Sequence, residues 1–348
     1  MDSKNITIYD VAREAGVSIA TVSRVLSGSA NVRPEKKEKV LEAVRRYNFT
    51  PNAMAQGLVN TKSNVIGMIV ADVRNPYFAE AFNACEKQAE KKGYTILLLN
   101  SWSDTCTEIN QLDKLMEQRV DAIVMLGGNG DQMEGSPEFQ EKLCQITQKI
   151  PMIITGPERG TGCYQVKIDD SRSMDLVLEH LLSLGHREIA FVGGYSSIAA
   201  TYEKKRRYER CMEERGISYP KEYVDNVYGY DAASGFAGMN GLLEKGFCPT
   251  AVIAINDYTA MGVLSSLHRH GYRVPEDIAL ASFDNTYIAE MATPQLTSVD
   301  YNYETIGEIL IDTAIQLING IDVPKIQIVE PGLIVRESTR HKIKSEND

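Results

Sequence analysis

The sequence predicts an α/β protein preceded by a small all-α head. Three observations support this fold class. Near the amino end, apolar residues recur at helical spacing and are interrupted by one glycine, whereas beyond residue 64 short apolar runs alternate with longer amphipathic stretches. The length of 348 residues also exceeds that of one average domain. We therefore expect a three-helix domain followed by two doubly wound lobes.

The segment 9–26, "YDVAREAGVSIATVSRVL", predicts a helix-turn-helix. Apolar residues form one stripe before Gly16 and another after it: Val11, Ala12 and Ala15, then Ala20, Val22, Val25 and Leu26. Gly16 suits the left-handed backbone that ends a first helix, and Ser18 can cap the second. This layout is typical of proteins that place the second helix in the major groove of DNA.

A third helix is indicated by Pro34 and by the run "PEKKEKVLEAVRRYNF". Four apolar residues recur there at helical spacing: Val40, Leu41, Val44 and Tyr47. Basic side chains lie on the outside of this helix, where some could contact phosphates and the others would be solvated: Lys36, Lys37, Lys39, Arg45 and Arg46.

The net charge of -10 is unevenly divided along the chain. Residues 1–62 contain ten Lys and Arg against six Asp and Glu, a balance of +4, which leaves 27 against 41, or -14, for the remainder. Only the head is therefore suited to a polyanion, although a solvated basic surface would account for so modest an excess.

Seven apolar runs in the body predict buried parallel strands: Val65 to Val70, Thr95 to Leu99, Ala122 to Leu126, Met152 to Thr155, Ile189 to Val192, Ala251 to Ile255 and Ile278 to Phe283. Amphipathic stretches between them predict helices at 77–92, 107–118, 171–184, 201–215 and 257–270. Ligands of open α/β sheets bind beyond the carboxyl ends of the strands. The residues that follow the runs are therefore candidates: Asp72, Trp102, Gly127, Tyr195, Tyr230, Asn256 and Asp284.

These candidates combine flat aromatic rings with carboxylates and an amide, which suits a sugar or a similar polyol. Each has a simpler interpretation. Trp102 and Tyr195 could be surface aromatics of the lobes, and Asp72 could cap the turn at Asn75 and Pro76.

Several protein classes are disfavoured by what the sequence lacks. It has neither a long apolar segment nor a basic, apolar amino end, so we expect a cytoplasmic protein without a membrane span. Six scattered cysteines without a C-x-x-C pair argue against metal ligation or disulfides. No nucleotide-phosphate loop, H-E-x-x-H or G-x-S-x-G motif is present, so we expect no catalytic residue, metal or cofactor.

Three blocks of the sequence resemble the LacI/GalR family of bacterial regulators. They are "TIYDVAREAGVSIATVSRVLSG", "YNFTPNAMAQGLVNTKSNVIGMIV" and "NDYTAMGVLSSLHRHGYRVPEDIALASFDN", and they stand in register over nearly the whole chain. The resemblance implies a periplasmic-binding-protein-like body that binds a small-molecule effector. It also implies a homodimer that binds a palindromic double-stranded operator.

In the resembled family the second helix contacts DNA. This implies that Ile19, Ala20 and Arg24 contact base edges, with Ser18, Thr21 and Ser23 near phosphates. Arg24 can form a forked contact with guanine. Ile19 and Ala20 offer only apolar contact, and helix packing is their alternative role.

The resemblance also makes residues 51–62 a hinge that folds on DNA. Asn52 and Ala55 would then contact DNA, and Leu58 would wedge between central base pairs in the minor groove. Gly57 weakens any helix formed there by about 1 kcal/mol relative to alanine. A plain flexible linker is the alternative.

The resemblance places effector contacts at Asp284, Asn256 and Tyr230. Lys204 stands where most relatives have an arginine that grips the effector, and it replaces a planar fork by a point charge. After a small register shift, neighbouring basic residues could take this role: Lys205, Arg206 and Arg207.

We therefore expect a DNA-binding domain at 1–50, a hinge at 51–62, a two-lobed domain at 63–340 and a polar tail at 341–348. The resemblance implies a first lobe of 64–166 plus 290–322 and a second of 167–289 plus 323–340. The tail has no heptads, so we expect a dimer rather than a tetramer.

A transcriptional repressor relieved by a sugar is the function that these features favour. Alternatives are a corepressor-dependent regulator with a non-sugar or protein effector, a sugar receptor without DNA function, and a sugar-processing enzyme. The receptor would have no use for a recognition helix, and the enzyme would need catalytic residues that the sequence lacks.

Overall fold

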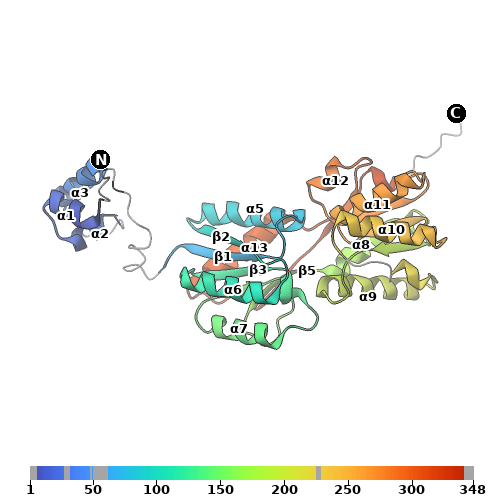
Figure 1. Ribbon diagram of the computed structural model, residues 1–348, viewed down its shortest axis with the longest axis horizontal. Coiled ribbons are helices and arrows are strands. Elements are labelled where there is room, and N and C mark those ends of the chain that lie inside the picture. The colour runs from blue at the N-terminus through green and yellow to red at the C-terminus, as the bar shows by residue number, and fades with distance from the viewer. Residues whose placement is uncertain (1–5, 27–31, 48, 50–61, 225–228, 341–348) are drawn as a thin grey trace. The chain divides into compact units, whose positions relative to one another are not determined.

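The computed structural model describes residues 6–26, 32–47, 49, 62–224 and 229–340. The chain divides into two compact units, Met1–Ser63 and Asn64–Asp348, here called the head and the body. Both are drawn in Figure 1. The predicted hinge residues Asn52, Ala55 and Leu58 and the predicted tail 341–348 lie outside the described residues.

The head contains the three predicted helices: α1 (Ile8–Ala15), α2 (Ile19–Leu26) and α3 (Pro34–Tyr47). Gly16 ends α1 with φ 62°, the left-handed conformation that glycine adopts without steric cost. Val11, Val22 and Val40 are fully buried, one from each helix, so the core holds all three helices together.

The first lobe of the body is a six-stranded parallel sheet in the order β10-β5-β4-β3-β1-β2. Its strands are β1 (Val65–Val70), β2 (Thr95–Asn100), β3 (Ala122–Leu126), β4 (Met152–Ile154), β5 (Tyr164–Ile168) and β10 (Ile326–Val329). Its helices are α5 (Pro76–Lys91), α6 (Thr105–Glu117), α7 (Pro137–Thr147) and α13 (Tyr303–Ile318). Helices α5 and α13 cover one face of the sheet and α6 and α7 the other (Figure 1).

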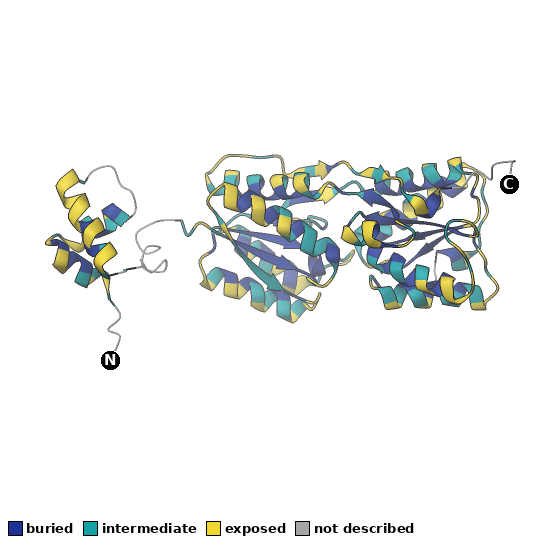
Figure 2. Cartoon of the chain, turned by 90° about the horizontal axis from the view of Figure 1, so that it is seen from above, coloured by how far each residue is buried: buried dark blue, intermediate teal, exposed yellow. Residues whose placement is uncertain are grey.

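The second lobe is a five-stranded sheet in the order β11-β9-β8-β7-β6, in which only β11 is antiparallel. Its strands are β6 (Ile189–Val192), β7 (Ala251–Ala254), β8 (Ala279–Asp284), β9 (Thr297–Asp300) and β11 (Gly332–Ile334). Its helices are α8 (Asp170–Ser183), α9 (Ala199–Glu214), α10 (Ala232–Glu244), α11 (Asp257–Arg269) and the short α12 (Tyr287–Met291). Figure 2 shows buried strands between helices whose outer faces are exposed.

All seven predicted strands and five predicted body helices are present, with ends shifted by at most two residues. Four further strands were not predicted from the sequence: β5, β9, β10 and β11. Polar side chains interrupt β5, "YQVKI", and β10, "IQIV", so neither is a continuous apolar run. Strand β10 lies at the sheet edge with Ile326 and Ile328 exposed, which pattern alone does not distinguish from a loop.

The predicted division into lobes is wrong at its boundaries. The chain leaves the first lobe after β5 at Ile168, returns after β9 at Asp300, and leaves again between β10 and β11. Residues 297–300 therefore belong to the second sheet and residues 326–329 to the first, opposite to the expected division. Hydrogen bonding between strands decides this membership, and it is not encoded locally.

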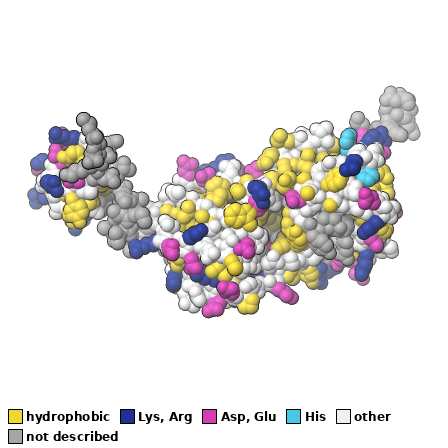
Figure 3. Space-filling view, viewed as in Figure 1, with side chains coloured by type: hydrophobic (Ala, Val, Ile, Leu, Met, Phe, Trp, Pro, Cys, Tyr) yellow, Lys and Arg dark blue, Asp and Glu magenta, His cyan; other side chains and the backbone are white. Residues whose placement is uncertain are grey.

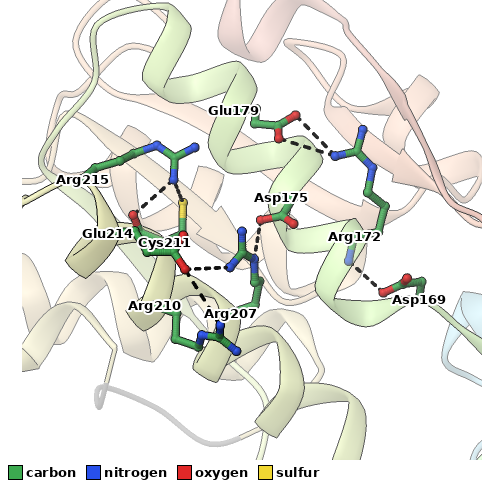
Figure 4. A network of polar contacts seen from close by, with 9 residues as sticks. All are labelled: Asp169, Arg172, Asp175, Glu179, Arg207, Arg210, Cys211, Glu214 and Arg215. Carbon is green, nitrogen blue, oxygen red and sulfur yellow. Dashed lines mark hydrogen bonds and ion pairs between the residues drawn. The ribbon is translucent and has the colours of Figure 1, made fainter.

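A polar network joins α8 to α9 on one face of the second sheet (Figure 4). The Arg207 Nε donates to Asp175 at 2.5 Å, and its Nη1 pairs with Glu214 at 3.6 Å. Burial of Tyr208, whose hydroxyl donates to the Ile189 carbonyl at 2.6 Å, anchors α9 on the sheet. The two helices are therefore fixed side by side, with the start of α8 next to Lys204 of α9.

Helices α10 and α11 pack so closely that glycine is required at their contact. A Cβ on Gly262 would lie 1.9 Å from the Ala232 carbonyl oxygen. We expect Gly262→Ala to lower the free energy of unfolding by about 1–3 kcal/mol, because backbone rather than a movable side chain must give way. Thermal or urea unfolding of the full chain measures this.

Gly241 of α10 is the matched control because a Cβ there meets nothing within 4 Å. Gly241→Ala should raise the free energy of unfolding by up to about 1 kcal/mol through helix propensity alone. Equal effects of the two substitutions would contradict the close helix contact.

Candidate functional site

The second helix of the head exposes the side chains that the sequence assigned to DNA. Ile19 is 41% exposed, and Ala20 and Arg24 are also exposed, together with Ser18. Thr21 and Ser23 are half-buried. Ala20 was also placed in the apolar stripe of α2, and this assignment is wrong because the stripe is carried by Val22 and Val25. Its methyl group is thus free of the core.

Local hydrogen bonds position the start of this helix. The Ser18 Oγ accepts from the Thr21 backbone N–H at 3.3 Å and lies 2.9 Å from the Thr21 Oγ1, so Ser18 caps α2 as predicted. Figure 3 shows Lys and Arg side chains on the visible face of the head. Arg46 is not purely solvated, because its Nη1 donates to Glu14 at 2.6 Å and ties α3 to α1.

A cavity of about 470 Å³ lies in the body between its two lobes. All three chain crossings contribute to its wall, through Ile168 and Asp170, through Tyr301, and through Val329. The volume falls in the range of roughly 300–1,000 Å³ that is usual for small-molecule sites. The crossings therefore make one wall continuous between the two lobes.

Five of the seven predicted effector residues line this cavity: Asp72, Lys204, Tyr230, Asn256 and Asp284. The Tyr230 hydroxyl lies 2.8 Å from the Thr201 Oγ1. The Asn256 amide is occupied, because its Oδ1 accepts from the Thr259 N–H at 2.7 Å and its Nδ2 donates to the Tyr230 carbonyl at 3.1 Å. Asn256 therefore caps α11 and holds Tyr230 in place.

Trp102 and Tyr195 do not line the cavity. Trp102 is 62% exposed in a left-handed turn after β2, where its neighbour Ser103 reaches the wall instead. Tyr195 is 45% exposed, with its ring centroid 5.7 Å from that of Tyr230. Tyr195 therefore supports a lining residue from outside, and the fold brings neither Trp102 nor Tyr195 into the cavity wall.

Asp72 is not the cap of the following helix. The Asn75 Oδ1 accepts from the Tyr77 N–H at 3.1 Å and caps α5 itself. Asp72 instead accepts from the Arg74 guanidinium, with an Nη2 to Oδ2 distance of 2.7 Å, and this contact lowers the pKa of the Asp72 carboxyl. Asp72 thus lines the cavity as part of an ion pair with Arg74.

Lys204 is 4% exposed and forms an ion pair with Asp170 at the start of α8. Its ammonium also lies 5.2 Å from the Phe283 ring centroid and 5.7 Å from that of Tyr301. The neighbouring basic residues are directed elsewhere: Lys205 to Ser196, Arg206 over Tyr202 and Arg207 to Asp175. No register shift is needed, since Lys204 itself lines the cavity.

The sequence did not reveal three cavity carboxylates, Asp131, Asp170 and Asp231. Asp170 follows the unpredicted strand β5, so no strand end pointed to it. Asp131 ends the glycine-rich segment Gly128–Asp131 after β3, where only the preceding Gly127 was a candidate. Its Oδ1 accepts from the Thr155 hydroxyl at 3.1 Å. The other aromatic side chains of the wall are Tyr77, Phe78, Tyr258 and Tyr301.

Burial raises the pKa of three cavity carboxyl groups, those of Asp131, Asp170 and Asp284. The pKa of Asp131 rises to about 7, opposed only in part by the hydrogen bond from Thr155. The pKa of Asp284 rises well above its usual range through burial and then through the charge of Asp257. For Asp170, burial raises the pKa and the Lys204 charge partly offsets this effect. Ionising all three without a ligand is thus costly.

Two buried acids outside the wall position the cavity loops. Glu108 of α6 accepts from the Asn129 N–H at 3.0 Å and holds the loop that carries Asp131. Asp257 of α11 accepts from the Ser282 hydroxyl at 2.6 Å and the Thr286 N–H at 2.7 Å. The second contact fixes the turn in which Asp284 has φ 97°, a strained value for a residue other than glycine.

Two negative findings apply to the described residues. No group of three His, Cys, Asp or Glu side chains among them could hold a metal ion. Among the same residues, every helix is too short or too polar to traverse a lipid bilayer.

Two family models match the chain. The model for bacterial regulatory proteins of the lacI family matches residues 7–52, and that for a periplasmic binding protein-like domain matches residues 178–339. Among solved structures, the Lac repressor dimer bound to operator and the anti-inducer ONPF is 25% identical, with a TM-score of 0.86 over 97% of this chain and 99% of that one. A complex of the transcriptional regulator CelR with cellobiose is 26% identical, with a TM-score of 0.70 over 96% of this chain and 99% of that one.

Two relatives with assigned functions are also regulatory proteins. Catabolite control protein A of Priestia megaterium is 36% identical over 308 residues, covering 88% of this chain and 90% of that protein. The regulator DegA of Bacillus subtilis is 32% identical over 339 residues, covering 96% and 98% respectively. The chain therefore belongs to the lacI family of bacterial regulatory proteins. It is a DNA-binding transcription regulator and not an enzyme, as the sequence predicted.

Asp131 provides a test of the cost of charge in the cavity. Because its folded-state pKa is raised to about 7, the carboxyl destabilises the ligand-free protein progressively as pH rises from about 4, and fully above 7. Asp131→Asn should raise the free energy of unfolding at pH 8 by on the order of 1–3 kcal/mol, and the gain should vanish toward pH 4. Melting curves across this pH range measure it.

Asp277 is a control of opposite sign, since Arg273 lowers its pKa to about 2. Asp277→Asn should lower the melting temperature at pH 8. A loss of stability in Asp131→Asn at pH 8 would contradict the assignment of Asp131 as an unfavourably buried charge.

Proposed function

We propose that this regulator is a cytoplasmic homodimer that represses transcription from a palindromic operator, and that a carbohydrate bound between the lobes controls its operator affinity. The observation that carries the proposal is a cavity lined by aromatic rings and carboxylates in a protein with an exposed recognition helix. A dimer presents two such helices, which matches the two-fold symmetry of a palindrome. Cytoplasmic location follows from access to DNA.

The head supports sequence-specific contact. Ile19 and Ala20 present apolar groups that can contact a thymine methyl. The Arg24 guanidinium can donate two parallel hydrogen bonds to a guanine. Ser18, Thr21 and Ser23 supply hydroxyls near the start of the same helix for phosphate contact. The contribution of Asn52, Ala55 and Leu58 to DNA binding stays part of this proposal.

The cavity supports carbohydrate binding. The rings of Tyr77, Tyr230 and Tyr301 can stack on the apolar face of a sugar, while Asp131 and Asp284 can accept hydrogen bonds from its hydroxyl groups. The solved CelR structure is a complex with cellobiose, so a similar body in this family accommodates a sugar. Together these features favour a sugar over a flat, fully apolar ligand.

Coupling between the sites would act through the spacing of the lobes. A sugar that contacts Asp131 of the first lobe and Asp284 of the second favours one spacing of the two. Beside the cavity, the Met133 N–H donates to the Ser197 carbonyl at 2.6 Å, a direct contact between the lobes that such a change would alter. The first strand begins at Val65, so the chain carries the movement to the predicted hinge. Such coupling typically amounts to about 1–3 kcal/mol.

Operator selection tests the DNA half of the proposal. From a pool of genomic fragments the full chain should enrich a palindromic site, and binding should weaken steeply with salt. Arg24→Ala should reduce the ratio of operator to random-DNA affinity about tenfold, because a lost guanine fork costs about 1–3 kcal/mol. Electrophoretic mobility shifts measure both affinities.

Arg13→Ala is the matched control, since Arg13 is an exposed arginine on α1 that lies 3.7 Å from Asp10. It removes the same charge and should keep the preference for the operator. If no fragment is enriched with or without metabolites, the proposed function is wrong.

The effector half is tested by release of the operator. A carbohydrate that frees operator from the wild-type chain should need at least about tenfold more ligand with Asp284→Asn, because a charged hydrogen-bond acceptor is lost. An unchanged response in this variant would show that Asp284 does not contact the effector.

A further inference from the structure

Acidic side chains outnumber basic ones in the wall of the cavity. Five carboxylates line it, Asp72, Asp131, Asp170, Asp231 and Asp284, against three cations, Arg74, Lys167 and Lys204. Buried acids as well as exposed ones contribute to this excess of acidic side chains. A ligand's charge therefore matters to its affinity as much as its shape.

Each cation of the wall is already engaged or faces solvent. Lys204 pairs with Asp170, Arg74 pairs with Asp72, and Lys167 is exposed. Arg159, which acts on Asp131 from outside the wall, donates to the carbonyls of Gln132 and Pro157. An anionic ligand would therefore have to displace an existing ion pair to find a cation.

Asp284 is the group that points to a ligand. It is 7% exposed and lines the cavity, and within the described part of the chain no side chain forms a hydrogen bond or an ion pair with its carboxylate. The charge of Lys204 acts on it only from a distance and offsets part of the effect of burial on its pKa. Asp131, on the first-lobe side, accepts one hydrogen bond from Thr155 and pairs with no described Lys or Arg. A buried carboxylate without a partner is costly, and a ligand that supplies donors removes this cost.

Helix amino ends, which often bind anions, are mostly occupied here. Side chains cap four of the helices that begin near the cavity: Asn75 caps α5, Asp169 caps α8, Asp231 caps α10 and Asn256 caps α11. Only α9, which begins after Ile198, has no side-chain cap among these. Few helix amino ends are thus left whose free N–H groups and partial positive charge could bind a phosphate.

Aromatic rings next to these acids favour a cation further. The Tyr77 ring lies 6.1 Å from that of Tyr301, nearly perpendicular to it, and burial followed by the charges of Asp131, Asp284 and Asp170 raises the pKa of its hydroxyl. The Lys204 ammonium already occupies such a position beside Phe283 and Tyr301. Rings and carboxylates together form the surroundings in which ammonium groups bind.

We propose, on the basis of the carbohydrate function above, that the cavity selects its ligand by charge. It rejects phosphorylated and carboxylated sugars, and it binds a protonated amino sugar more tightly than the neutral parent sugar. The amine would contact Asp284 or Asp131, and the remaining carboxylate would accept ring hydroxyls.

The test compares sugars that differ only in charge, using the full chain. The panel is glucose, glucosamine, glucose 6-phosphate and glucuronate, with the corresponding galactose and mannose derivatives. Binding is followed by melting temperature and by the fluorescence of Trp102, the single tryptophan, which adjoins the lining residue Ser103. At least one amino sugar should bind about tenfold more tightly than its parent, and no phosphate or uronate should stabilise the protein.

Isosteric variants locate the effect. Asp284→Asn and Asp131→Asn should each reduce the preference for the amine over the neutral sugar about tenfold or abolish it. Asp322→Asn, a change of an exposed acid outside the cavity, should leave the preference intact. Because the readout is a ratio of two affinities for the same variant, a general loss of stability does not mimic the result.

Three outcomes would overturn the charge selection: a phosphate or uronate that binds as well as its parent, an amino sugar that binds no better than its parent, or a panel without any stabilising sugar. If the operator is selected and then released by a sugar phosphate, charge selection fails while the proposed function stands. If the chain binds amino sugars but enriches no operator, charge selection stands while the proposed function fails.

Discussion

The body is organised by the three passages of the chain between its lobes. Each passage supplies part of the cavity wall, at Ile168 and Asp170, at Tyr301 and at Val329. Because strands on both sides of every passage are hydrogen-bonded into different sheets, the wall cannot form until both sheets have formed. The ligand site is therefore a property of the two-lobed fold as a whole, and any change in lobe spacing alters it.

Buried acids serve two purposes in this body. Glu108 and Asp257 are fully buried and accept several hydrogen bonds each, so they hold the loops that carry the cavity residues. Asp131 and Asp284 instead face the cavity with few or no partners, and burial raises the pKa of both carboxyl groups. Ionisation of these two acids should therefore cost stability that a bound ligand can restore.

In the head, the buried and exposed residues of α2 lie on opposite sides of the helix. A core of small apolar side chains, with Val11, Val22 and Val40 at its centre, leaves the opposite side of α2 exposed. Glu14 draws Arg46 and Tyr47 toward α1, so one basic residue contributes to the packing of helices. One face of this eight-residue helix consequently packs in the core, and the opposite face carries the side chains proposed to contact DNA.

The sequence alone determined the helix-turn-helix, the alternation of strands and helices, and five of the cavity residues, because helical periodicity, apolar runs and the residues that follow them are local features. Only the tertiary structure decided which sheet receives β5, β9 and β10, since short strands of mixed polarity depend on their neighbours for pairing. It also decided that Asp131 and Asp170 enter the cavity while Trp102 and Tyr195 remain outside. The direction of a side chain beyond a strand end depends on the turn around it, and distant contacts such as that between Asp257 and Thr286 set that turn.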